Sequence, residues 1–332
     1  MRVTQNSIIT PFENSLQDIQ TRQLQEQIRI STGKQLLSLS DDPRKVRVSK
    51  TLSAAISRNE TFANNIDESL NEMRAVSTEI DAMSAKIDQI RENAVDATLG
   101  GVSKNVATFG VNIKAILQDV IKDANTSFNN HYIFGGTKTT SQSIDPLATV
   151  TRYPFEMVTD PNAPANGNFS GLMVTFNGNN NDRLINTGAE TTAVINTKAN
   201  ELFGNNVTAS FASIINLYNV LMYKSDGTLR QTDDTLNKAD TAKVNQYYQG
   251  ISNIYDNLTI AGASNGSRLN RLQVVKDQIT EENLRLKEYL SAEADTDIAK
   301  TTIDLKKDDN ALQYTLQIGS RIMTNSLFDF LK

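Results

Sequence analysis

Cysteine and tryptophan are absent from this 332-residue chain, and histidine occurs once, as His131. Without cysteine the chain can form no disulfide, no thiol nucleophile and no cysteine-bearing zinc or iron–sulfur site. A serine-type catalytic triad would depend on His131 as its base, yet this residue lies among aromatic residues in a segment typical of a packed or solvated turn. Carboxylate chemistry stays open, because Asp and Glu together number 38.

Excess positive charge is also lacking, since the formal net charge is −5. A surface that neutralises nucleic-acid phosphates would be basic, so we expect no nucleic-acid partner. The N-terminus has no apolar segment of the kind found in cleaved secretory signals, and no apolar run approaches the roughly 18 residues that span a bilayer. We therefore expect no membrane partner and no cleaved signal.

Proline and glycine are scarce, at 6 and 16 residues, and their positions divide the chain into three parts. Residues 44–99 and 267–318 contain neither, whereas four prolines and the polar run 177–182 lie between them. This pattern predicts a long helix, an irregular or β-rich middle and a second long helix. A first helix of this length would span roughly 84 Å, whereas a compact chain of this size is about 50 Å across. We therefore expect an elongated rod with a lobe.

The first long tract carries apolar residues in a coiled-coil register. Apolar a and d positions sustained over four or more heptads form a narrow stripe suited to a partner helix. We call this stripe the rod seam and assign it to Ile66, Met73, Val76, Ile80, Met83, Ile87 and Ile90. Further helices are predicted over 106–128 and 211–222, and strands over 172–176 and 193–195. The apolar register slips at 291–297, which predicts a kink there.

The segment Ser40-Asp41-Asp42-Pro43 predicts the start of the first long helix. An Asp side chain can accept hydrogen bonds from free N–H groups of the first turn, and proline is tolerated there. We therefore assign Asp41, Asp42 and Pro43 as a structural cap, against the alternative of paired catalytic or metal-binding carboxylates.

Short segments spread along the chain carry a family resemblance. They are Arg2–Thr4, Ser31–Lys34, Asp41–Pro43, Asn64–Ile66, Tyr132–Gly136, Ala292–Asp297 and Ser326–Leu331. In this order they resemble the flagellar hook-associated protein type 3 family, the flagellin-like hook–filament junction proteins. The resemblance covers roughly the first 140 and last 70 residues. Filament flagellins usually carry a stretch of small residues after the Asp pair, whereas Pro43-Arg44-Lys45-Val46 follows here.

The helical pattern and the resemblance together predict a mainly α fold. It is an elongated flagellin-like rod, a coiled-coil bundle from both termini, with a small inserted α+β or β lobe. We expect a terminal assembly domain at 1–43 and 298–332, a rod domain at 44–140 and 258–297, and a variable lobe at 141–257. Terminal helices of such proteins pack against neighbouring subunits. This assigns the subunit interface to Ile9, Phe12, Leu16, Ile19, Leu312, Leu316, Met323, Leu327, Phe330 and Leu331.

The resemblance implies a structural subunit, not an enzyme, that joins the hook to the flagellin filament. The implied partners are the first hook-associated protein, flagellin, copies of the chain itself and a flagellar export chaperone; no cofactor or metal is expected. Export would use the flagellar type III system without a cleaved signal and leave the chain outside the cell, in the flagellum. The alternatives are a filament-forming flagellin, a non-flagellar coiled-coil adhesin, or a carboxylate-dependent hydrolase in the middle lobe.

Overall fold

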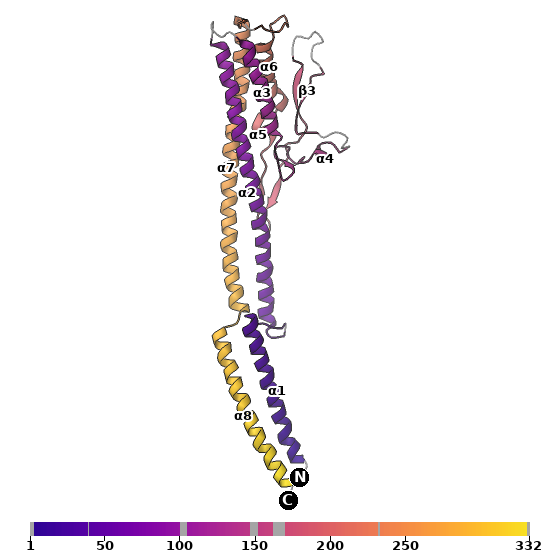
Figure 1. The fold of residues 1–332 in the computed structure, drawn as a ribbon, viewed down its shortest axis with the longest axis vertical. Helices are drawn as coiled ribbons and strands as arrows, with labels where there is room; N and C mark the ends of the chain where they lie inside the picture. The colour runs from indigo at the N-terminus through magenta and orange to yellow at the C-terminus, as the bar shows by residue number, and fades with distance from the viewer. Residues whose placement is uncertain are drawn as a thin grey trace. The chain divides into compact units, whose positions relative to one another are not determined.

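The fold of this chain is taken from a computed structural model (Figure 1). It describes residues 3–38, 40–99, 105–146, 152–161, 170–231 and 233–330. The chain divides into two compact units. We call Met1–Glu60 with Thr280–Lys332 the terminal unit, and Thr61–Ile279 the central unit.

Helices form the terminal unit in its described part. The helices α1 (Val3–Thr32) and α8 (Ile298–Phe330) lie side by side, as Figure 1 shows. The first turns of α2 (Pro43–Thr98) and the last turns of α7 (Lys238–Ala294) complete the unit. The gap between α7 and α8 coincides with the predicted slip of the apolar register. The observed start of α2 agrees with the predicted helix start at Pro43.

The core of the central unit lies between the long helices and two shorter ones, α3 (Val106–Ala124) and α6 (Val207–Met222). All rod-seam residues are buried, with at most 1% of each exposed. Val76 and the later seam residues belong to one large apolar cluster with residues of α3, α6 and α7. Ile66 and Met73 pack in a smaller cluster with Leu272 and Ile279 of α7. The seam therefore contributes to two cores rather than to a single helix pair.

Antiparallel strand pairs and short helices make up the rest of the central unit. The pairs are β1 (Ser127–Phe128) with β2 (His131–Tyr132), β3 (Phe155–Thr159) with β4 (Leu172–Phe176), and β5 (Leu184–Asn186) with β6 (Thr192–Val194). The short helices are α4 (Ser141–Ile144) and α5 (Ala199–Phe203). The side-chain amide of Asn125 donates a hydrogen bond of 2.8 Å to the carbonyl of Phe155 and accepts one of 2.9 Å from its N–H, which ties the end of α3 to β3. The prediction of a mainly helical fold with small β elements is confirmed.

The long helix α7 begins at Lys238, 29 residues before the glycine-free tract that predicted it. Residues 238–257, which the sequence assigned to the inserted lobe, therefore belong to a helix of 57 residues. Val244, Ile251 and Ile254 of this stretch are buried in the large cluster. Packing of these side chains outweighs the modest cost of glycine within a helix.

Candidate functional site: the paired terminal helices

The pairing of α1 and α8 rests on one close apolar contact and two polar ones. Gly319 is buried, and a Cβ atom placed on it would lie 2.9 Å from Cε2 of Phe12, so only glycine lets this ring approach α8 so closely. Arg22 forms an ion pair with Asp308 at 3.0 Å. The amide of Gln23 donates a hydrogen bond of 2.8 Å to the neighbouring Asp309. These contacts fix the register of the pair.

Both terminal helices also expose large apolar side chains. The most exposed are Leu24 (58%) on α1 and Ile298 (56%), Ile303 (55%), Tyr314 (66%), Leu316 (52%) and Ile318 (56%) on α8. Covering a side chain of this size is worth about 1.5–3 kcal/mol. Exposed large apolar side chains also occur on other elements, such as Val111 on α3 and Ile260 on α7.

The predicted interface residues fall into three groups. Ile19 is buried, with 5% exposed, and so contributes to the packing of the unit itself. Phe12, Leu16 and Leu312 are half-buried, whereas Leu316 is exposed. The side chains of the remaining residues lie outside the described part of the structure: Ile9, Met323, Leu327, Phe330 and Leu331. The interface assigned from the sequence did not include Leu24, Ile303 and Tyr314, because periodicity shows where apolar residues recur but not which are covered within the chain.

The segment that follows α1 is joined to the segment between α7 and α8. Gly33 has a φ of +68°, which favours glycine, and its carbonyl accepts a hydrogen bond of 2.9 Å from the N–H of Thr296. The N–H of Gln35 donates to the carbonyl of Ala294 at 2.8 Å. Beside this backbone ladder, Lys34 and Asp295 form an ion pair at 2.6 Å. The contact with Lys34, together with Ser291, lowers the pKa of Asp295 below its ordinary value of 3.8.

The two Asp residues of the predicted cap have different partners. Asp42 accepts hydrogen bonds of 3.0 Å from the N–H groups of Arg44 and Lys45, in the first turn of α2. Asp41 instead accepts from the hydroxyl and N–H of Ser38 and from the N–H of Leu37, in the preceding turn. These bonds, those from Ser38 first, lower the pKa of Asp41. Both carboxylates are thus satisfied by local donors.

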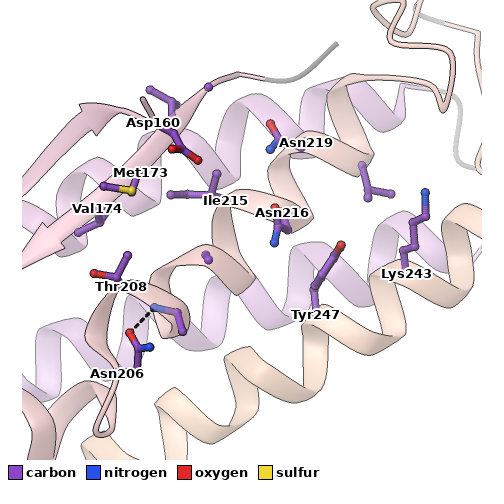
Figure 2. Close-up of a pocket in the computed structure, with 15 residues that line it drawn as sticks. Asp160, Met173, Val174, Asn206, Thr208, Ile215, Asn216, Asn219, Lys243 and Tyr247 are labelled. Carbon is purple, nitrogen blue, oxygen red and sulfur yellow. Dashed lines mark hydrogen bonds between the residues drawn. The ribbon is translucent and has the colours of Figure 1, made fainter. Parts of the chain in front are cut away.

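A groove of about 570 Å³ lies in the central unit between β4, α6 and α7 (Figure 2). Met173 and Ile215 line its apolar wall, and Asn216 and Tyr247 extend into it from α6 and α7. Asp160 is the one carboxylate among its lining residues. Carboxylate-dependent glycoside hydrolysis uses a pair of acids, so this lining does not provide that chemistry.

No group of three metal-ligating side chains occurs among the residues that the structure describes. The sole histidine, His131, is exposed on β2. Within the described helices, none is long and apolar enough to cross a membrane.

The N-terminal part of the chain matches a known family. Residues 3–139 match the family described as the bacterial flagellin N-terminal helical region. These residues form a flagellin-type N-terminal region. No curated protein gives a significant match to the sequence.

Solved structures of flagellar proteins share the fold. The hook-associated protein 3 of Legionella pneumophila has a TM-score of 0.57 at 13% identity, covering 73% of this chain and 98% of that one. A second structure, of the flagellar junction protein FlgL from the same organism, gives 0.53 at 13% identity, covering 76% and 100%. A Vibrio parahaemolyticus protein assigned to the hook-associated proteins gives 0.56 at 18% identity, covering 77% and 100%. The fold of the hook-associated proteins thus extends over about three quarters of this chain.

Proposed function

We propose that this chain is a structural subunit of the bacterial flagellum that joins the hook to the flagellin filament. The observation that carries the proposal is the shared fold, which spans nearly the whole length of solved hook-associated and junction proteins. The flagellin-type N-terminal region supports the same assignment. Such a subunit works by binding other chains, and it needs no catalytic site.

The terminal helices are the proposed assembly surface. Leu316, with Phe12, Leu16 and Leu312 at the edge of the α1–α8 pair, would contact neighbouring subunits, and we add the exposed Tyr314. The remaining interface residues proposed from the sequence are Ile9, Met323, Leu327, Phe330 and Leu331, whereas Ile19 supports the pair from inside. Burial of the exposed interface side chains in an assembly would add apolar stabilisation to the terminal unit.

The proposed partners are the first hook-associated protein on one side, flagellin on the other, and copies of the chain within its own layer. An export chaperone would cover the C-terminal helix before assembly. The chain would leave the cell through the flagellar type III system without a cleaved signal. A filament-forming flagellin is the second candidate, because the matched N-terminal region is that of flagellin.

Deletion of the gene followed by electron microscopy tests this function. We expect hooks without filaments and flagellin released into the medium, and the full chain should restore attachment. A chain truncated after Gln317 should not restore it, whereas one with 145–255 replaced by a short Gly/Ser linker should. Filament loss without free flagellin would favour the filament role, and restoration by the truncated chain would refute the terminal assembly surface.

A further inference from the structure

The groove of about 570 Å³ between β4, α6 and α7 contains polar groups that the fold leaves unused. Asn219 is the clearest case, because it lines the groove and is buried, with 7% exposed (Figure 2). Its Oδ1 atom accepts a hydrogen bond of 3.2 Å from the N–H of Ser170, but its side-chain nitrogen has no partner among the described residues. A buried amide donor without an acceptor is costly. A ligand that accepts a hydrogen bond from Asn219 would therefore stabilise this groove.

Other side chains with hydrogen-bonding capacity line the same space. Asn216 precedes Asn219 by about one turn of α6 and is half-buried, and its amide has no partner in the described part of the chain. The hydroxyl groups of Thr208 on α6 and Tyr247 on α7 also lack a partner there. Amides and hydroxyls supply both donors and acceptors. The groove can therefore satisfy a ligand that carries both kinds of group.

The described lining residues include one acidic and one basic side chain, on different sides of the groove. Asp160 directly follows β3, and Lys243 lies on α7 (Figure 2). A ligand charge of either sign would be attracted by one of them and repelled by the other. A hydroxyl group suits both, because it donates to a carboxylate and accepts from an ammonium group. The charges therefore favour a neutral ligand with several hydroxyl groups.

Apolar side chains complete the lining. Met173 of β4 and Ile215 of α6 lie on one side, and the ring of Tyr247 lies on the α7 side (Figure 2). Sugar rings carry hydroxyl groups around their edge and apolar C–H groups on their faces, which aromatic and aliphatic side chains cover. Small-ligand sites usually have volumes of about 300–1,000 Å³ and combine an apolar lining with a few placed polar groups. The groove has this size and this composition.

We propose that this groove binds a neutral sugar. The hydroxyl groups of the sugar would bond to Asn216, Asn219, Asp160 and Lys243, and one face of its ring would cover Ile215. Because the lining has a single carboxylate, the sugar is bound and not hydrolysed. The inference goes beyond the proposed junction role, which assigns assembly to the terminal helices and expects filament attachment without residues 145–255.

Saturation-transfer NMR on the full-length chain tests the proposal, because it detects weak binding of small ligands. The probes are free glucose, galactose and mannose, each compared with its own uronic acid and its own amino sugar. We expect at least one of the neutral hexoses to bind and both of its charged relatives to bind several-fold more weakly. An array of neutral glycans is the second arm. A chain that binds the array but no free hexose recognises the sugar as part of a longer glycan.

Substitutions in the lining locate the site. Asn216→Leu removes an amide that has no role in the described packing, and it should weaken binding of the sugar about tenfold. The matched control is Asn245→Leu, at an exposed position on α7 that does not line the groove, and it should bind like wild type. Asp160→Asn should improve binding of the uronic acid relative to the hexose, and Lys243→Gln should do so for the amino sugar. Circular dichroism verifies that each variant is folded.

Three results would overturn the proposal. The first is a wild-type chain that binds neither the free hexoses nor the neutral glycans of the array. The second is a loss of binding that is equal for Asn216→Leu and Asn245→Leu, which would place the sugar elsewhere. The third is a uronic acid or amino sugar that binds wild type more tightly than its hexose, which would identify a charged ligand instead. Because sugar binding and filament attachment are measured separately, failure of this inference leaves the junction role intact.

Discussion

Two glycines in α7 predict opposite outcomes for the same substitution. A Cβ atom added at Gly266 would meet no atom within 4 Å, whereas one added at Gly250 would lie 2.9 Å from Cβ of Ser213 on α6. Alanine is favoured over glycine in a helix interior by about 0.8–1 kcal/mol. Gly266→Ala should therefore stabilise the central unit by nearly that amount. In a unit of about 200 residues, this raises the melting temperature by roughly 2–4 °C.

Gly250→Ala should destabilise the same unit. The gain in helix propensity remains, but α6 and α7 must separate to relieve the contact with Cβ of Ser213, which no side-chain rotation can move. Overpacking of this kind costs about 1–3 kcal/mol. The net effect should be a loss of up to about 2 kcal/mol.

Thermal and urea unfolding of both variants measure this difference. A double variant, Gly250→Ala with Ser213→Gly, tests its origin, because removing Cβ of Ser213 should restore part of the lost stability as a favourable coupling energy. Equal shifts for Gly250→Ala and Gly266→Ala would refute the close approach of α6 and α7. So would a double variant whose effects are simply additive.

Three other substitutions test the rod seam, the pairing of α1 with α8, and the ion pair between Lys34 and Asp295. Ile80→Asp should destabilise the central unit by several kcal/mol, because a charge would replace a side chain that is 1% exposed; melting temperatures equal to wild type would contradict the heptad assignment. Gly319→Ala should displace the ring of Phe12 and so weaken the contact between α1 and α8, since the added Cβ would collide with the end of this side chain; faster proteolysis of both ends would report it. Asp295→Asn should cost the terminal unit less than about 1 kcal/mol at neutral pH, because its ion pair with Lys34 is partly exposed. The folded pKa of Asp295 lies below 3.8, so this stabilisation is present above that pH and is lost as the pH falls through the folded pKa; unfolding curves of wild type and variant should converge in acid.

The Ile80 substitution has a control on the same helix. Asp81 is exposed, and its side chain has no partner among the described residues. Asp81→Lys should therefore leave the melting temperature nearly unchanged. Glu79 is a poorer control, because burial and the nearby Asp123 raise its pKa.

The long helices could be predicted from sequence because their signals are local. The heptad repeat of the rod seam and the absence of glycine and proline placed α2 within one residue of its observed bounds. The strand β4 was found over Leu172–Phe176 by its β-branched and aromatic residues. Its partner β3 was missed, because Pro154 and Pro161 flank it; its pairing partner β4 is the next strand, which begins at Leu172.

The start of α7 could not be predicted, because glycine residues in a sequence usually indicate the end of a helix and α7 contains several of them. In the structure these glycines lie inside the helix, Gly266 with open space around it and the other two facing neighbouring helices. Gly250 faces Ser213 of α6, and a Cβ added at Gly262 would lie 3.5 Å from Ile80 of α2. Only the packed structure distinguishes a glycine that ends a helix from one that lies inside a helix and lets another helix pack closely against it.

Buried apolar side chains are unevenly distributed between the two units. Among its described residues, Ile19, Ile56 and Ala294 are the only apolar side chains in the buried class, whereas the central unit contains two extensive clusters. The helices α1 and α8 nevertheless have 30 and 33 residues, and ordering each residue costs about 1–2 kcal/mol of backbone entropy. Local hydrogen bonds and exposed ion pairs contribute little net stability against this cost. A terminal unit that buries so little within one chain would gain most from contacts with other chains, and this supports the proposed role of an assembling subunit.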